Sequence, residues 1–168
     1  AEQQKVFQRG SRRRIILATN VAETSLTIPG IRFCIDSGLA RISRYKPATR
    51  IQQLQIERIS QASARQRRGR CGRTADGVCV HLYSEDDFNR FPEYTDPEIK
   101  RTSLAGVILQ MAALHLPRID RFPFIDPPPA PLIREGMNTL EDLLAIQPGG
   151  KVTAEGWRLS ALPIDPHL

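Results

Sequence analysis

Short apolar runs between polar turns dominate the first half of the chain. Residues 15–18 (IILA), 31–36 (IRFCID) and 78–83 (VCVHLY) are the three clearest cases. Short, largely apolar runs without strict alternation are typical of strands that are buried on both faces of a parallel sheet. Because segments with helical character lie between them, we expect an α/β layer with a parallel sheet.

Two further segments alternate in part between apolar and polar positions. Residues 40–45 and 51–56 flank the turn-forming sequence KPAT, which predicts a β-hairpin. Residues 61–68 contain neither glycine nor proline and follow Ser60, whose hydroxyl can cap a helix. We therefore expect a short helix between the hairpin and the last strand.

The second half of the chain changes to helical periodicity. Asp96 and Pro97 favour a helix start, because an acidic cap precedes a proline at the first helical position. We expect one helix from there to Pro117, a fixed proline-rich loop over residues 122–131 and a second helix over residues 132–146. The apolar residues at helical spacing, which we expect to face the core, are Leu104, Val107, Ile108, Met111, Leu114, Ile133, Met137, Leu140, Leu143 and Leu144.

The end of the chain predicts one more short helix. Thr153 can cap a helix that runs to Leu162 and stops at Pro163. Two helices followed by a glycine turn and a short extended piece fit a winged-helix arrangement. At the other end, residues 1–8 have the character of a helix already under way, so we expect the chain to be a fragment.

The charge distribution suggests a class of ligand. The chain carries 24 basic and 18 acidic residues, a net charge of +6, and its arginines gather at residues 9–14, 41–50 and 65–73. A basic surface of this kind attracts phosphate, and hence nucleic acid or nucleotide. A solvated basic face without a ligand fits the same composition equally well.

Cysteine content and hydropathy argue against several classes of protein. An odd number of cysteines, three, leaves at least one unpaired and favours a reducing, cytoplasmic compartment. The longest apolar stretch, residues 104–116, is shorter than the roughly 20 residues that cross a bilayer, so we expect no membrane partner. Cys71, Cys79 and His81 lack the usual spacing of zinc ligands, so we expect no metal site. Cys79 and Cys34 lie within apolar strands and are expected to be buried free thiols.

The densest chemical signal is residues 66–73, QRRGRCGR. Arg67, Arg70 and Arg73 recur every three residues at the end of the predicted helix, so they lie near one face. An arginine presented from a facing surface stabilises the negative charge that phosphoryl transfer places on the γ-phosphate, and Gln66 can orient water. By composition alone, a general RNA-binding segment is the better interpretation.

A second signal, residues 18–31 (ATNVAETSLTIPGI), directly follows the first predicted strand. It crowds short hydrogen-bonding side chains, which contact sugar and phosphate oxygens without reading base identity. Taken alone, the segment is better interpreted as a polar turn that caps a helix, with Glu23 as a structural anchor.

Together, TNVAETSLT, the basic hairpin and QRRGRCGR resemble the second RecA-like lobe of the DEAH/RHA family of ATP-dependent RNA helicases, as its motifs V and VI. GLARISRY and QRRGRCGR are most similar to the bacterial branch of the family. The sequences LYSEDDF, PEIKRTSLAGVILQMAALHL, FPFIDPPP and VTAEGWRLSALPIDP extend the resemblance over essentially the whole chain.

The resemblance implies three regions. Residues 1–94 match the C-terminal part of the second RecA-like lobe, a partial parallel sheet from which a β-hairpin, residues 39–58, projects. Residues 95–155 match a mostly helical winged-helix domain, and residues 156–168 match the start of a helical-bundle domain.

The resemblance also implies roles for individual residues. Three residues are implied to face the ATP γ-phosphate: Gln66, Arg70 and Arg73. Arg70 and Arg73 would act as arginine fingers. Those that bind the nucleotide or sense its state are Phe7, Ser25 and Arg67. Those that contact the RNA backbone are Thr19, Asn20 and Thr27. Pro29 stands where many relatives carry aspartate, which leaves open any ribose or metal contact from that position.

The implied activity is ATP hydrolysis at the junction of two RecA-like lobes, coupled to movement on single-stranded RNA or on a duplex with an overhang. The chain contains no G-x-x-x-x-G-K-[ST] segment and no DEAH tetrapeptide. We therefore expect a first lobe, outside these residues, to hold most of the ATP and Mg²⁺ contacts, and the chain alone to be inactive. The first lobe and the helical bundle are its expected partners within one protein.

Two alternatives stay open at this point. The chain is a non-enzymatic nucleic-acid-binding module that uses its winged helix, or it is a scaffold that binds proteins through its proline-rich loop. A base-reading helix should carry basic and amide side chains. The second predicted helix carries Glu135, Glu141 and Asp142 beside Arg134 and Asn138, which makes it a poor reader.

Overall fold

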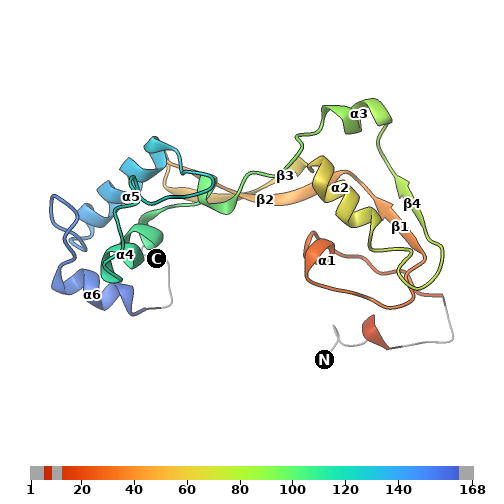
Figure 1. The fold of residues 1–168 in the computed structure, drawn as a ribbon, viewed down its shortest axis with the longest axis horizontal. Coiled ribbons are helices and arrows are strands. Elements are labelled where there is room, and N and C mark those ends of the chain that lie inside the picture. The colour runs from red at the N-terminus through yellow and green to blue at the C-terminus, as the bar shows by residue number, and fades with distance from the viewer. Residues whose placement is uncertain (1–5, 9–12, 163–168) are drawn as a thin grey trace. The chain divides into compact units, whose positions relative to one another are not determined.

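A computed structural model describes residues 6–8 and 13–162 (Figure 1). The chain divides into two compact units. Unit 1 comprises residues 1–42 and 54–95, and unit 2 comprises residues 43–53 and 96–168. The two strands of the hairpin therefore belong to unit 1 at their outer ends and to unit 2 near the turn.

Unit 1 is built around a small parallel sheet of two strands. β1 (Phe33–Asp36) pairs with β4 (Val78–His81), with Phe33 beside Val78 and Asp36 beside His81. The other elements with residues in unit 1 are α1 (Val21–Thr24), β2 (Leu39–Lys46), β3 (Ile51–Arg58), α2 (Gln61–Arg68) and α3 (Glu85–Arg90). The coarse prediction of an α/β layer with a parallel sheet and a hairpin is confirmed.

Two helices of unit 1, α2 and α3, have side-chain caps at their N-termini, and the cap at Ser60 was predicted. The Ser60 side chain accepts a hydrogen bond from the Ser63 backbone at 3.1 Å, and α2 covers residues 61–68 as expected. Ser84 and Asp87 form a capping box at the start of α3. Each cap satisfies backbone N–H groups that the first turn of a helix leaves without partners.

One face of the sheet in unit 1 is apolar and open to solvent. Phe33 and Ile35 of β1 and Val78 and Val80 of β4 are all exposed, on the side opposite to Cys34 and Asp36. The buried apolar cluster of this unit has three members, Ile59, Ala64 and Phe91, and lies elsewhere.

The predicted strand at residues 15–18 is wrong. The segment has no regular structure, and Ile15 and Leu17 expose 87% and 94% of their surface. An extended segment becomes a strand only when a neighbour takes its backbone hydrogen bonds. In the part of the chain that the structure describes, β1 pairs with β4 and no strand pairs with residues 15–18.

Unit 2 is mostly helical. After a 3-10 turn, η2 (Glu98–Lys100), it contains α4 (Ala105–Ala113), α5 (Ala130–Asp142) and α6 (Ala154–Ser160). Thr153 caps α6 by accepting from the Gly156 backbone at 3.0 Å, as predicted, and Ile146 and Val152 form an antiparallel bridge before it. The winged-helix assignment stays a prediction.

The start of the first helix in unit 2 was predicted too early. Residues 98–100 form only a 3-10 turn, and α4 begins at Ala105. The Thr102 hydroxyl donates to the Glu98 carbonyl at 3.0 Å, and the Arg101 side chain donates to the Asp96 carbonyl at 3.2 Å. The Thr102 backbone N–H also donates to the Glu98 carbonyl, at 3.1 Å, so one helix-type hydrogen bond forms here although the α-helix itself starts later.

The end of the second helix also differs from the prediction. α5 ends at Asp142 instead of residue 146, because Leu144 adopts a left-handed backbone conformation with φ of 56°. Leu144 is therefore exposed. Val107, Leu114 and Leu143, which were also expected in the core, are exposed as well. The last helix likewise ends at Ser160, before the predicted Leu162.

The core of unit 2 joins α4 and α5 with the segment that follows them. Gly136 of α5 allows this packing, because a Cβ atom there would lie 2.9 Å from Ile108 Cδ1 and 3.1 Å from the Ala105 nitrogen. The buried residues are Tyr45, Leu104, Ala105, Ile108, Leu109, Met111, Ile119, Leu132, Leu140, Ala145 and Ile146.

Candidate functional site

Asp36, at the end of β1, is the most buried charged group of unit 1. Its side chain is 0% exposed. One carboxylate oxygen accepts from the Gly38 backbone at 3.0 Å and from Arg67 Nη1 at 2.8 Å. The other accepts from the Tyr83 hydroxyl at 2.9 Å, with His81 Nδ1 at 3.5 Å. A carboxylate this deep is tolerated because it is paired and hydrogen-bonded.

Arg67 of α2 connects this carboxylate to the segment before β1. Its Nε donates to Glu23 at 2.9 Å, and its Nη1 donates to Asp36 and, at 3.0 Å, to the Leu39 carbonyl. The Arg67 side chain is 14% exposed and that of Glu23 is 11% exposed. Arg67 therefore holds α1, α2 and the end of β1 at one point.

The pKa values in this cluster follow its hydrogen bonds. Burial by itself raises the pKa of Asp36, but the bonds from Gly38, Arg67 and Tyr83 outweigh it and hold that pKa below its usual range. Burial lowers the pKa of Arg67, and its two carboxylate partners more than offset this, so the net shift is upward. Asp36 and Arg67 are thus both charged in the neutral range.

Arg70 and Arg73 differ from Arg67 in their partners. Arg70 Nη1 lies 3.4 Å from the Leu26 carbonyl, and its Nε is buried without a hydrogen-bond partner. Arg73 Nη1 donates to the Thr27 hydroxyl at 2.9 Å, and its Nε lies 3.3 Å from the Gly69 carbonyl. With the carboxylates that the structure describes, neither guanidinium forms an ion pair.

The three arginines at spacing three thus bind three neighbouring positions of the segment before β1. Arg67 binds Glu23, Arg70 approaches Leu26 and Arg73 binds Thr27. Segments more than 40 residues apart in sequence are brought together in this way. The two strongest chemical signals of the sequence therefore form one site.

The remaining predicted residues of the segment before β1 are exposed around α1. The Thr19 hydroxyl accepts from the Val21 backbone at 3.4 Å, and Asn20 stands at the helix start without a side-chain cap. The Ser25 and Thr24 hydroxyls lie 3.4 Å apart. These hydroxyl and amide groups face solvent, where a ligand can reach them.

Gln66 and Phe7 are also exposed. Gln66 lies on α2 with its side chain in solvent, and Phe7 lies in a short 3-10 turn. Most of the predicted helix over residues 1–8 lies outside the described residues. The backbone at Gly72 is left-handed, with φ of 79°, and brings Arg73 back toward Thr27.

Asp36 and Tyr83 are the site residues that sequence reasoning missed. The available signal was an acidic residue that ends an otherwise apolar run, IRFCID, which is an uncommon place for an unpaired charge. Gly38 belongs with them, because its φ of 71° lets its N–H reach Asp36, while a Cβ atom there would meet the Tyr83 ring at 2.6 Å.

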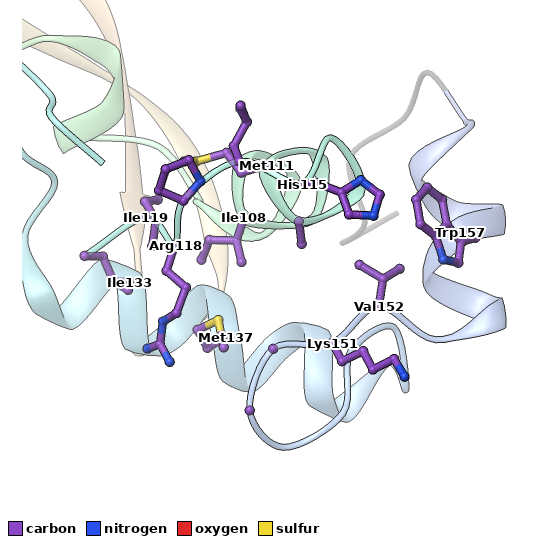
Figure 2. A pocket seen from close by; sticks show the side chains of 15 residues that line it. Ile108, Met111, His115, Arg118, Ile119, Ile133, Met137, Lys151, Val152 and Trp157 are labelled. Atoms are coloured by element: carbon purple, nitrogen blue, oxygen red, sulfur yellow. The ribbon is translucent and has the colours of Figure 1, made fainter. Parts of the chain in front are cut away.

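Unit 2 contains a separate apolar cavity of about 500 Å³ (Figure 2). Its lining comes from α4 (Ile108 and Met111), α5 (Met137), α6 (Trp157) and Val152, which precedes α6. The centroids of the Trp157 and His115 rings lie 6.1 Å apart. Lys151 and Arg118 add positive charge at its wall. None of the predicted site residues belongs to this cavity.

The cysteines do not combine into a metal site. Over residues 6–8 and 13–162, no three histidine, cysteine or acidic side chains gather as metal ligands. Cys34 and Cys79 lie side by side in the sheet and are half-buried, where full burial was predicted, whereas Cys71 is buried. Burial and the neighbouring Cys34 raise the pKa of Cys79 to about 12. None of the helices in the described ranges has the length and apolar character to cross a bilayer.

Comparison with known proteins matches the chain to helicases. The model of the helicase conserved C-terminal domain matches residues 1–75. The chain is 58% identical to the ATP-dependent RNA helicase HrpA of Escherichia coli over 100% of the chain and 13% of that protein. It is 44% identical to the probable ATP-dependent RNA helicase DHX35 of Homo sapiens, over 98% of the chain and 24% of that protein.

Solved structures agree with these relatives. The crystal structure of the Escherichia coli DEAH/RHA helicase HrpB matches 98% of the chain and 21% of the HrpB chain, with a TM-score of 0.89 and 33% identity. The chain thus corresponds to a minor part of each of these longer proteins.

Proposed function

The chain belongs to the DEAH/RHA family of helicases, and on this basis we propose that it supplies the arginine fingers of an ATP-driven RNA helicase. In the whole protein, a first RecA-like lobe would hold ATP and Mg²⁺ and face unit 1. Hydrolysis between the two lobes would drive movement along RNA. The chain by itself is expected not to hydrolyse ATP.

The observation that carries this proposal is the difference between Arg67 and its two successors. Arg67 takes both nearby carboxylates, Glu23 and Asp36, whereas Arg70 and Arg73 contact only neutral oxygens. A guanidinium without a countercharge, such as that of Arg70 with its buried and unpartnered Nε, retains its full attraction for a phosphate oxygen. This is the arrangement that stabilisation of a γ-phosphate requires.

We assign RNA contacts to the exposed hydroxyl and amide groups around α1. Thr19, Asn20 and Thr27 present neutral donors and acceptors, which suit the sugar–phosphate backbone and do not read bases. Ser25 lies between Glu23 and Thr27, so its position depends on both Arg67 and Arg73, and this supports a role in sensing the nucleotide.

We assign the remaining nucleotide contacts to two residues whose side chains are exposed, Gln66 and Phe7. Gln66 precedes Arg67 on α2 and is free to orient a water at the γ-phosphate. Phe7 is exposed and able to stack on the adenine ring. We assign the ligands of Mg²⁺ to the first lobe, because the chain contains no G-x-x-x-x-G-K-[ST] segment and no DEAH tetrapeptide.

The domain boundaries remain part of the proposal. We assign residues 1–94 to the second RecA-like lobe, with the hairpin at 39–58, residues 95–155 to a winged-helix domain and residues 156–168 to the start of a helical bundle. The division of the described chain into a sheet-containing unit and a helical unit near residue 95 supports this assignment.

The test is ATP hydrolysis by the full-length protein that contains this chain. Arg70→Ala and Arg73→Ala should each lower kcat by about 10³-fold, because an arginine finger contributes a factor of that order. Arg68→Ala is the matched control, since Arg68 is exposed on the same turn but outside the spacing of three. Wild-type kcat in both finger variants would contradict the proposal.

RNA binding separates this proposal from a winged-helix reader. The affinity for single-stranded RNA should fall in Thr27→Ala and stay unchanged in Arg134→Ala, an exposed position on α5. Sequence preference should be weak and the affinity should depend on salt, because the contacts are to the backbone. Loss of binding only in Arg134→Ala would favour the module without enzymatic activity.

A further inference from the structure

Arg67 carries a full positive charge next to the proposed fingers, yet the chain's own acceptors already use two of its three guanidinium nitrogens. Three hydrogen bonds, to Glu23, Asp36 and the Leu39 carbonyl, fix its Nε and Nη1. We propose that Arg67 does not contact the nucleotide and that Asp36 is a positioning residue, which sets the two arginine fingers through Arg67. This inference rests on the proposed function and extends it.

The Asp36 carboxylate is a fixed point. Both of its oxygens accept hydrogen bonds, and donors from three different segments reach it: the backbone at Gly38, Arg67 of α2 and the hydroxyl of Tyr83. The Tyr83 ring is itself held by the Phe91 ring, with centroids 5.1 Å apart. A buried carboxylate with this many donors has little freedom to rotate.

Arg67 transmits this position in two directions. Arg67 lies in the last turn of α2, and Arg70 and Arg73 follow in the segment directly after the helix, so the orientation of this turn sets where that segment leaves α2. Across to α1 it holds Glu23, two residues before Ser25 and four before Thr27. The groups proposed to contact ATP and those proposed to contact RNA therefore share one anchor.

Loss of the Asp36 charge should displace the fingers without removing them. Misplacement of a catalytic group by about 1 Å can lower a rate by about 10²-fold. We therefore expect a large effect on the chemical step and a small effect on nucleotide affinity, because most ATP contacts are assigned to the first lobe.

The experiment compares Asp36→Asn with wild type in the full-length protein, with RNA at saturation and well below the melting temperature. The expected result is a fall in kcat of about 10- to 100-fold, with the KM for ATP changed by less than about twofold. Asp87→Asn is the control, since Asp87 belongs to the α3 capping box outside this cluster, and its kcat should equal that of wild type.

A merely structural role for Asp36 gives a different result. The melting temperature would fall, while kcat per folded molecule would stay at the wild-type value, and this outcome would overturn the proposal. If Asp36→Asn yields no folded protein by circular dichroism, Glu23→Gln replaces it, because Glu23 binds the other side of Arg67. The same criterion on kcat and KM then decides.

Arg70→Ala, measured in parallel, separates this inference from the proposed function. An inactive Arg70→Ala beside a fully active Asp36→Asn would reject only the positioning role. A fully active Arg70→Ala would reject the arginine-finger assignment itself.

Discussion

Unit 1 and unit 2 are held together by different interactions. Unit 2 buries eleven residues in one apolar cluster around α4 and α5. Among its described residues, unit 1 buries three in its apolar cluster, and its charged cluster of Asp36, Arg67 and Glu23 joins α1, α2 and the end of β1. Apolar burial provides most of the stability of a folded domain, whereas a buried ionic network fixes geometry at little net gain. The comparison indicates that the buried interactions of unit 1 mainly fix the position of its arginines, whereas those of unit 2 mainly stabilise the fold.

The strongest test of this comparison removes the central charge of unit 1. Arg67→Met should destabilise unit 1 by about 3–5 kcal/mol, because it leaves Asp36 and Glu23 buried without a countercharge. Hydrogen exchange measured by mass spectrometry should show faster exchange in β1, β4 and α2. Equal acceleration in α4 and α5 would show that the two units do not differ in this way.

The corresponding change in unit 2 is Leu140→Ala. Leu140 is fully buried on α5, and removal of its side chain should cost about 3 kcal/mol through lost burial and the cavity that remains. Trp157, the single tryptophan, lies in unit 2, so its fluorescence during urea unfolding follows this unit. Leu144→Ala is the control, because Leu144 is largely exposed and its loss should leave the urea midpoint unchanged.

A comparison of two glycines in unit 1 tests the close contact between Gly38 and the Tyr83 ring. Gly38 and Gly30 both have a left-handed backbone, with φ of 71° and 78°, so alanine at either position costs about 1–2 kcal/mol in strain. At Gly38 alone, the new Cβ atom would also collide with the Tyr83 ring. Gly38→Ala should therefore lower the melting temperature of unit 1 more than Gly30→Ala does, and equal effects would rule out the close contact.

The pH dependence of stability should be a smaller difference between the units. The pKa of Asp36 is lower in the folded chain, so its contribution is present above its unfolded pKa, about 3.9, and is lost as pH falls toward the folded value. Hydrogen exchange between pH 6 and pH 3 should show unit 1 opening before unit 2. Asp36→Asn should remove this difference, and an unchanged pH profile in that variant would contradict the assignment.

The local elements were predictable because their signals are local. The bounds of α2 and its Ser60 cap, the hairpin and the Thr153 cap all follow from residues within one turn of each other. The spacing of Arg67, Arg70 and Arg73 predicted that they share one face of a helix, but α2 ends at Arg68, so only Arg67 belongs to it. Residues 15–18 were predicted wrongly because an apolar run indicates a strand but does not supply a neighbour to pair with.

The division of labour among the arginines was not predictable. Asp36 lies 31 residues from Arg67 and 47 from Tyr83, and the three meet through the pairing of β1 with β4 and the packing of α2 against β1. Spacing assigns the same surroundings to all three arginines, whereas partners distant in the sequence make Arg67 different. The late start of α4, at Ala105, was likewise not predicted.

The open apolar face formed by Phe33, Ile35, Val78 and Val80 has a practical consequence for anyone who purifies the 168-residue chain. Exposed apolar surface promotes aggregation in water, and the free edge of a strand beside it can pair with a strand of another chain. Preparations of the isolated chain should therefore be kept dilute, and their light scattering should rise with concentration.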